Sequence, residues 1–323
     1  MSELVSNLDE AAATEPGALL LLRPRGFCAG VVRAIDVVRL ALEKLGRPVY
    51  VRKEIVHNGF VVNELANQGA IFVEELDEVP EESVVVFSAH GVSPSVRESA
   101  RERRLHVIDA TCPLVTKVHL ELIRYARENY TVVLVGHRDH DEVIGTLGEA
   151  PERVRLISSV EDVDKLEVPD PHRLAYLTQT TLSVDDTAEI VARLKERFPE
   201  IAAPPGEDIC YATQNRQSAV KSVASRVELV LVVGAKNSSN SNRLVEVAER
   251  AGARAYLVNE AKDIQAAWLQ ASPRLAVTAG ASTPEVLVAE VVAYLGRNGY
   301  TRIVDVDAVE ESVRFALPVE LRA

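Results

Sequence analysis

The sequence predicts an α/β fold built on parallel sheets. Short apolar runs of strand length alternate along the chain with longer segments in which apolar residues recur at helical spacing, and this order is typical of strand–helix–strand units. Polar loops rich in histidine, serine and threonine follow several of the runs. Ligands of parallel α/β sheets bind at that end of the strands, so the loops are the first place to look for a site.

The predicted strands are short and apolar, as expected for strands buried on both faces. In chain order they comprise residues 18–22, 49–51, 84–88, 105–108, 132–135, 174–177, 229–233, 255–258, 275–278 and 303–306. Helices are expected after Cys28, at 61–68 and 96–103, from Pro113, after Cys210 and at 284–295.

Length and charge narrow the classes of function. A chain of 323 residues is expected to form two or three domains of about 100 residues each. The net charge of −12 argues against nucleic acid as a partner, because a phosphate backbone requires an excess of Lys and Arg on one face. The apolar runs are far shorter than the ~20 residues needed to cross a bilayer. The acidic stretch to Pro16, which we expect to be loosely held, lacks the basic segment of a signal peptide. We therefore expect no membrane partner and a cytoplasmic location.

Cys112 stands at a predicted strand-to-helix corner in the stretch DATCPLVTKVH. Pro113 suits the first position of a helix, because its missing N–H would have no partner there. The positive end of the helix dipole then favours a thiolate, which is a nucleophile or a metal ligand. A lone cysteine at such a corner is more often a small packing residue. The other two cysteines, Cys28 and Cys210, also precede predicted helices, and this recurrence favours chemistry over packing.

A threefold repeat underlies the order of cysteines and polar loops. A first polar loop follows each cysteine by 29, 28 or 29 residues, and a second one comes later in each third. The first loops contain His57, His140 and Ser239, and the second contain His90, Thr180 and Ser282. Regular strand spacing alone is common in α/β proteins, so it is the kind of residue in these loops that distinguishes the repeat.

We therefore expect three small α/β domains, arranged as a pseudo-threefold trefoil that brings three thiolates together. The first spans 17–112 and contains Cys28, His57 and His90, and the second spans 113–205 and contains His140, Glu142 and Thr180. The third spans 206–300 and contains Cys210, Ser238, Ser239, Asn240 and Ser282, and a strand and tail follow at 301–323.

Three converging thiolates indicate a metal centre. Thiolates select zinc or iron–sulfur clusters, and an odd number of cysteines in a reducing compartment argues against a disulfide framework. Structural sites of either kind usually take four protein ligands, so three cysteines leave one position open. In a 4Fe–4S cluster that position would be an iron that binds a substrate oxygen and delivers electrons.

The loop residues indicate an anionic substrate. Small donors of this kind suit phosphate oxygens rather than a base or a sugar; they are His57, His90, His140, Ser238, Ser239, Asn240 and Ser282. Histidines at strand ends are more often structural, and only the matched set shifts that balance. Glu142 is the carboxylate of the matched loops and is interpreted as a proton donor, although a solvated acid at a helix start is the plainer alternative. Thr180 and Thr181 are candidates to relay that proton.

The motifs resemble those of the LytB/IspH family of 4-hydroxy-3-methylbut-2-enyl diphosphate reductases. The matching stretches are RGFCAGVVRAI, HN at His57, SAHGVSP, DATCPLVTKVH, HDEVIGT, TQTTLSVDDT, DICYATQNRQ, KNSSNSNRL and AGASTP, and they run from about Pro24 to Pro284. The resemblance implies the family fold, a trefoil of three α/β domains around a central iron–sulfur cluster. It also implies the reductive removal of the C4 hydroxyl from an allylic diphosphate, the last step of the methylerythritol phosphate route to isoprenoids.

Carried over residue by residue, the resemblance implies a role for each candidate. Cys28, Cys112 and Cys210 would hold one 4Fe–4S cluster per chain with one open iron. His57, His90, His140, Thr180, Ser238, Ser239, Asn240 and Ser282 would contact the substrate, with Glu142 as the proton source beside Thr180. The implied electron donor is a ferredoxin or a flavodoxin.

Two other classes of function remain alternatives at this point. A metal protein that only binds a partner would need no matched polar loops, and Glu142 would be idle. A phosphosugar enzyme without a cofactor would use the same histidines and serines, with the cysteines as packing residues. The breadth of the motif match disfavours both alternatives.

Overall fold

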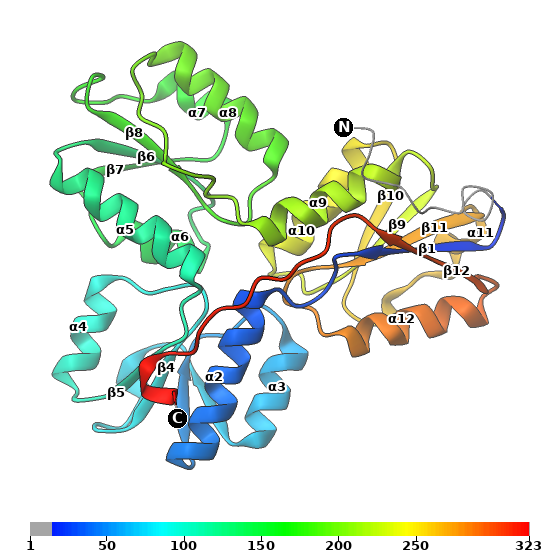
Figure 1. Cartoon of the computed structure of the whole chain (residues 1–323), viewed down its shortest axis with the longest axis horizontal. Helices are drawn as coiled ribbons and strands as arrows, with labels where there is room; N and C mark the ends of the chain where they lie inside the picture. Colours follow the sequence, from blue (N-terminus) through cyan, green and yellow to red (C-terminus); the bar gives the residue numbers. More distant parts are fainter. Residues whose placement is uncertain (1–14, 323) are drawn as a thin grey trace. The chain divides into compact units, whose positions relative to one another are not determined.

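The computed structural model describes residues 15–322 and has three parallel sheets (Figure 1). Most of the expected first 16 loosely held residues lie outside the described range. The described chain divides into two compact units. One unit, here called the five-stranded unit, comprises the described residues to Cys28, His57–Gly59 and Tyr211–Val313. The other, called the two-sheet unit, comprises Ala29–Val56, Phe60–Cys210 and the tail from Arg314.

The five-stranded unit contains one parallel sheet with the strand order β10-β9-β11-β1-β12. The strands are β1 (Ala18–Arg23), β9 (Leu229–Val233), β10 (Arg254–Val258), β11 (Arg274–Ala279) and β12 (Arg302–Asp307). The helices are α9 (Tyr211–Ala224), α10 (Ser239–Arg250), α11 (Ala266–Gln270), α12 (Glu285–Arg297) and the short η2 (Ala261–Asp263).

Strand β1 shows why these strands are apolar throughout. Leu20 and Leu22 pack in the core under α9 and α10, whereas Leu19 and Leu21 pack in the core under α12. Successive side chains of a strand point to opposite faces, and Figure 1 shows helices on both faces of this sheet. A continuous apolar run is therefore required.

The two-sheet unit contains a four-stranded sheet of order β3-β2-β4-β5 and a three-stranded sheet of order β7-β6-β8, both parallel. The strands of the first are β2 (Val49–Arg52), β3 (Ala70–Val73), β4 (Val84–Phe87) and β5 (His106–Asp109), and those of the second are β6 (Thr131–Val135), β7 (Val154–Ile157) and β8 (Leu174–Thr178). The helices are α2 (Ala29–Leu45), α3 (Gly59–Gln68), α4 (Pro94–Glu102), α5 (Pro113–Arg127), α6 (Asp141–Leu147), α7 (Val160–Lys165) and α8 (Val184–Arg197), with η1 (Leu76–Glu78) and η3 (Val319–Leu321).

The three-stranded sheet also has a core on each face. Val133 and Val135 of β6 pack with residues of α7 and α8, and Val132 and Leu134 pack with residues of α5 and α6 (Figure 1). Helices therefore cover both faces, as they do in the five-stranded sheet.

The α/β class and the parallel sheets are confirmed, and every predicted strand is present. Two strands, β3 and β7, were not predicted. Both lie at the edge of their sheets, so one side of each is partly open to solvent. Ile71 is exposed in β3, and β7 carries the polar Arg155 between apolar neighbours. An edge strand needs no continuous apolar run, which is why the sequence pattern missed β7. Strand β3 is an apolar run, AIFV, that the prediction did not include.

The pairing of β1 corrects the expected grouping of strands. The first domain was expected at 17–112, which groups residues 18–22 with 49–51, and 301–323 was treated as a separate tail. Strand β1 instead pairs with β11 and β12 in the five-stranded sheet. Adjacency in the sequence does not say which strands pair, so the predicted pattern held no information on the two neighbours of β1. The other domain boundaries stay predictions.

Candidate functional site

All three cysteines directly precede a helix, as predicted. Helix α2 begins one residue after Cys28, α9 begins one residue after Cys210, and Cys112 is the N-cap of α5 with Pro113 at its first position. The three cysteines lie in the described part of the chain, are half-buried and form no disulfide. Thiols at helix N-termini favour the thiolate form. This donor set fits a thiolate-ligated metal centre.

Each cysteine is tied by its backbone to one of the polar loops. The N–H of Cys112 donates to the carbonyl of Ala89, next to His90, at 3.0 Å. The N–H of Cys210 donates to the carbonyl of Thr180 at 3.0 Å. In the five-stranded unit, the N–H of Cys28 donates to the carbonyl of Ala281 at 3.1 Å, next to Ser282.

These contacts shift the boundaries of the predicted repeat unit. Counting forward from each cysteine paired Cys28 with His90, Cys112 with Thr180 and Cys210 with Ser282. In the structure Cys112 instead contacts the loop of His90, and Cys210 contacts the loop of Thr180. Cys28 contacts the loop of Ser282, the last polar loop of the chain. The repeat is therefore cyclic, and its unit is two polar loops followed by a cysteine.

Glu142 and Thr180 form a buried pair in the two-sheet unit. Glu142 is 3% exposed and Thr180 is 5% exposed. The backbone N–H of Thr180 donates to Oε1 of Glu142 at 2.6 Å, and the Thr180 hydroxyl donates to Oε2 at 2.8 Å. The Thr146 hydroxyl fixes the backbone of Glu142 by donating to its carbonyl at 2.8 Å. Both carboxylate oxygens are thus held against the same threonine.

His140 and His90 lie close to this pair in the same unit. His140 is the N-cap of α6, and its Nδ1 accepts a hydrogen bond from the backbone N–H of Glu142 at 3.2 Å. An accepting Nδ1 places the proton of a neutral imidazole on Nε2, which can then donate to a ligand. The rings of His90 and His140 meet edge to face, with centroids 5.9 Å apart, and Nδ1 of His90 lies 3.3 Å from the Ser88 hydroxyl.

The remaining predicted ligand contacts lie in the five-stranded unit. Asn240 is 4% exposed, and its Oδ1 accepts from the N–H of Ala281 at 2.8 Å. Among the described residues its amide Nδ2 has no hydrogen-bond partner. Ser282 donates to the carbonyl of His57 at 3.0 Å, and Ser238 caps α10, one residue before Ser239. A buried amide donor without a hydrogen bond costs free energy, and an anionic ligand would accept that hydrogen bond.

A buried ion-pair cluster supports the two histidine loops and was not predicted. His119, which was given no role, is 5% exposed, and its Nδ1 lies 2.8 Å from Oε1 of Glu149, which also pairs with Arg97. The His119 ring lies against Gly91, which follows His90, and against Gly145, which comes three residues after Glu142. A Cβ added at Gly145 would lie 3.3 Å from the carbonyl carbon of Gly91, so the two loops touch through their backbones.

A second missed pair connects two cysteine corners. Lys117 of α5 lies 2.9 Å from Asp208, whose side chain is fully buried. Burial raises the pKa of Asp208 to about 6, although hydrogen bonds from Lys117 and the Thr178 N–H act in the other direction. Neither residue follows a strand of the predicted pattern, so no sequence signal marked them.

Arg33 fixes the corner that contains Cys112. Its guanidinium donates to the carbonyl of Thr111 at 3.0 Å, to that of Asp109 at 3.4 Å and to that of Ala316 at 2.7 Å. The tail from Arg314 therefore packs in the two-sheet unit through an arginine that also binds the segment just before Cys112.

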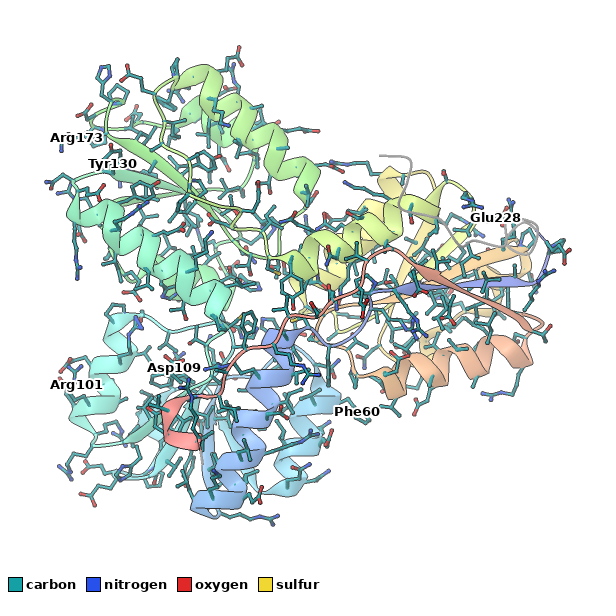
Figure 2. All side chains as sticks on the ribbon, in the orientation of Figure 1. Phe60, Arg101, Asp109, Tyr130, Arg173 and Glu228 are labelled. Carbon is teal, nitrogen blue, oxygen red and sulfur yellow. The ribbon has the colours of Figure 1, made fainter. Side chains whose placement is uncertain are left out.

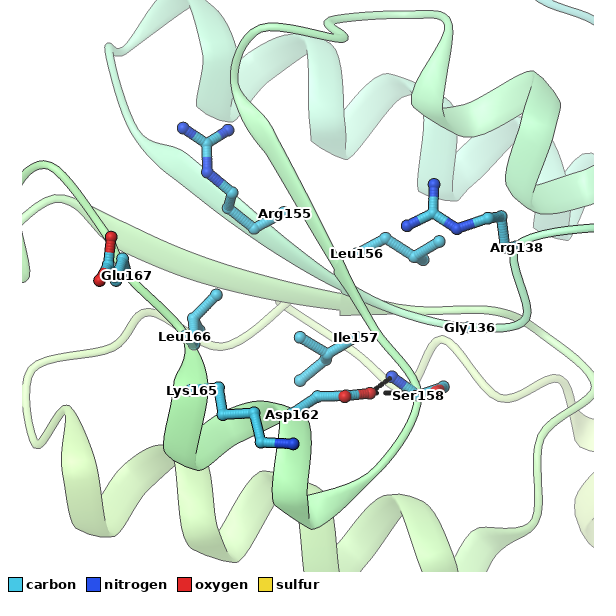
Figure 3. Close-up of a pocket in the computed structure, with 10 residues that line it drawn as sticks. All are labelled: Gly136, Arg138, Arg155, Leu156, Ile157, Ser158, Asp162, Lys165, Leu166 and Glu167. Atoms are coloured by element: carbon cyan, nitrogen blue, oxygen red, sulfur yellow. Dashed lines mark hydrogen bonds between the residues drawn. The ribbon is translucent and has the colours of Figure 1, made fainter.

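Two surface cavities lie in the two-sheet unit. One, of about 570 Å³, lies beside β7 and α7, where Asp162 accepts hydrogen bonds from Ser158 (Figure 3). None of the predicted site residues lines it. The other, of about 730 Å³, includes Thr111 and Pro113 on either side of Cys112, and Asp109, labelled in Figure 2, also lines it.

Comparisons with known proteins agree with the motifs. The family model described as LytB protein matches residues 19–296. A 4-hydroxy-3-methylbut-2-enyl diphosphate reductase of Streptomyces coelicolor is 55% identical over 314 residues, which cover 97% of this chain and 93% of that protein. One of the same name from Leifsonia xyli is 58% identical over 305 residues, covering 94% and 90%. The solved structure of the E-1-hydroxy-2-methyl-but-2-enyl-4-diphosphate reductase from Plasmodium falciparum has a TM-score of 0.91 and 42% identity, covering 94% of this chain and 96% of that chain.

Glu149→Gln should destabilise the two-sheet unit in a pH-dependent way. Burial acts to raise the pKa of Glu149, but His119 and Arg97 outweigh it and hold the pKa below its usual 4.5. A carboxyl group with a lowered pKa stabilises the fold above its unfolded pKa and loses that contribution as the pH falls through the folded value. The difference in unfolding free energy from wild type should therefore be full at pH 7 and shrink below about pH 4.5.

The measurement is equilibrium urea unfolding at several pH values, with exposed Glu152→Gln as the matched control. A difference that stays constant down to pH 3 would show that the Glu149 charge does not act through this cluster.

Proposed function

The chain belongs to the LytB family, and from that premise we propose that it reduces (E)-4-hydroxy-3-methylbut-2-enyl diphosphate to isopentenyl diphosphate and dimethylallyl diphosphate. This is the last step of the methylerythritol phosphate route. The names of its relatives support this activity, since they share more than half of their residues with this chain over nearly its whole length. The observation that carries the proposal is the cyclic contact between each cysteine and a polar loop.

Cys28, Cys112 and Cys210 are proposed to hold one 4Fe–4S cluster per chain, with one iron left without a protein ligand. Support comes from three half-buried thiols at helix N-termini and from the family. When bound, such a cluster supplies electrons together with a Lewis-acidic position. Cysteines without a disulfide and such a cluster suit a reducing compartment, so we propose a cytoplasmic location. No helix within residues 15–322 is long and apolar enough to span a membrane.

The substrate diphosphate is proposed to bind to small donors on the polar loops. They are His57, His90, His140, Ser238, Ser239, Asn240 and Ser282. The unpartnered Nδ2 of Asn240 supports this role, because a phosphate oxygen would satisfy this buried donor. The hydrogen bond that Nδ1 of His140 accepts also supports it, because it fixes the orientation of the ring. Short donors on strand-end loops match the small oxygens of a phosphate group.

Glu142 is proposed as the proton source and Thr180 as the group between it and the substrate hydroxyl. The reaction takes up two electrons and two protons, breaks one C–O bond and releases water. In the structure the Thr180 hydroxyl donates to Oε2 of Glu142 at 2.8 Å. A proton on Oε2 would reverse this hydrogen bond, so that the carboxyl donates to Oγ1 of Thr180 while the threonine hydroxyl turns and gives its own hydrogen to the leaving oxygen. The backbone bond from Thr180 to Oε1 keeps the carboxyl oriented for this transfer. Burial of both residues keeps water away from that path.

A ferredoxin or flavodoxin is proposed as the electron donor. The cavity beside Cys112 supports this proposal, because three cations and two carboxylates line it in a chain whose net charge is −12. They are Arg33, Lys117, Arg124, Asp109 and Glu121. Leu120 of the same cavity is 60% exposed. An apolar contact within a locally basic surface suits a small acidic redox protein.

The activity is tested first by cluster content. Protein purified without oxygen should contain about four iron and four sulfide per chain, and its electron paramagnetic resonance spectrum after reduction should change when the allylic diphosphate is added. Cys112→Ser should lose the cluster. Wild-type protein without iron, or a Cys112→Ser variant with full iron content, would refute the ligand assignment.

Glu142→Gln should bind the substrate but turn it over at least about 100-fold more slowly, because the amide still accepts from Thr180 but carries no acidic proton. Equilibrium binding and single-turnover rates with a chemical reductant separate the two effects. Near-normal turnover would remove Glu142 from the proton path.

Arg124→Glu should slow turnover with reduced ferredoxin by roughly tenfold at low salt, since a reversed charge at an interface rim lowers the association rate. Turnover with dithionite should be unchanged, because Arg124 is exposed and far along α5 from Cys112. The matched control is Arg173→Glu, an exposed arginine that precedes β8 (Figure 2). An equal loss with both reductants would contradict docking at this cavity.

A further inference from the structure

Lys117 ties together two segments that each lead to a cysteine. It lies on α5, the helix capped by Cys112. Its ammonium group donates to the carbonyl of Gly206 at 3.1 Å, to that of Glu207 at 3.0 Å and to Oδ1 of Asp208 at 2.9 Å. An ammonium has three hydrogens, so these three acceptors match its full capacity. All three acceptors lie just before Cys210 in the chain.

Asp208 extends the same connection to the loop that holds Glu142. Its Oδ2 accepts from the backbone N–H of Thr178 at 3.0 Å, at the end of β8. Two residues later in each segment, the N–H of Cys210 donates to the carbonyl of Thr180 at 3.0 Å. The segments 178–180 and 208–210 therefore run side by side with two fixed contacts, and the second threonine is the one that binds Glu142.

The burial of Asp208 shows that this arrangement is costly to maintain. Its side chain has no exposed surface, whereas Lys117 is 31% exposed. Removing a carboxylate from water costs several kcal/mol unless it is paired and hydrogen-bonded. A packing role alone would be served as well by an apolar residue, so the pair indicates a need for defined positions.

We propose that Lys117 and Asp208 are positioning residues that hold Cys210 at a fixed place relative to Cys112 and to Thr180. The inference rests on the proposed function, because it concerns two of the three proposed cluster ligands. Groups that orient metal ligands without touching the metal typically change metal affinity or activity about 10- to 100-fold when removed. In this protein the effect is expected on cluster retention before it is seen in the stability of the fold.

The test is the rate at which the holoenzyme loses iron to a chelator without oxygen, followed by visible absorption. Lys117→Met alone leaves Asp208 buried and unpaired, so it can lower the stability of the fold. The decisive variant is therefore Lys117→Met combined with Asp208→Asn, made in a Glu121→Gln background because the Lys117 ammonium also lies 3.5 Å from the buried Glu121. The asparagine still accepts from the Thr178 N–H and removes the unpaired charge, but Gly206 and Glu207 lose their common donor.

The combined variant should lose iron about tenfold faster than Glu121→Gln alone, while the thermal unfolding midpoint of the apoprotein stays close to that of Glu121→Gln alone. Lys195→Met, on the exposed side of α8, is the matched control and should match wild type in both measurements.

Iron loss at the rate of Glu121→Gln alone, or faster iron loss accompanied by an equally large fall in apoprotein stability, would overturn the positioning role. A wild-type holoenzyme that retains its cluster in the same experiment distinguishes that result from failure of the proposed function. Wild-type protein that never contains a cluster would overturn the proposed function and this inference together.

Discussion

The backbone hydrogen bond from each cysteine to a polar loop is the constraint on which the candidate site depends. In each case a strand-end loop offers a carbonyl, and the residue that accepts the bond is, or adjoins, a predicted ligand contact: Ala89, Thr180 and Ala281. A thiol and its neighbouring polar side chain are thus positioned by the same short segment of backbone. The bond involves no side chain, so it occupies neither the thiol nor the polar side chain.

The N-termini of helices position candidate site residues in a similar way elsewhere. In a parallel α/β sheet a strand ends where the next helix begins, so N-cap residues lie at the edge where ligands bind. Cys112 caps α5 and Ser238 caps α10. The Ser238 hydroxyl accepts from the N–H of Ser241, and the glycine at 280 leaves room for the Ser241 side chain. Local capping requirements and ligand contacts therefore select similar residues at these positions.

The sequence was sufficient to predict the strands of the sheet interiors, the cysteine corners and the polar loops, because each has a local pattern. It was insufficient for the partners of β1. The expected first domain grouped it with residues 49–51, whereas β1 lies between β11 and β12. Edge strands such as β7 were missed because Arg155 interrupts their apolar pattern. In each case the local pattern held no information on which distant segment lies beside the strand.

Buried polar pairs could not be predicted from the sequence for the same reason. Lys117 and Asp208 are 91 residues apart, and His119 and Glu149 are 30 apart, so no helical or strand period relates either pair. Each pair nevertheless joins a loop that contains candidate site residues to helix α5. A buried ion pair adds little net stability compared with apolar packing, and losing one partner is costly. Charges retained at such places are better explained by the position they impose than by the stability they add, and Lys117 imposes it on the segment just before Cys210.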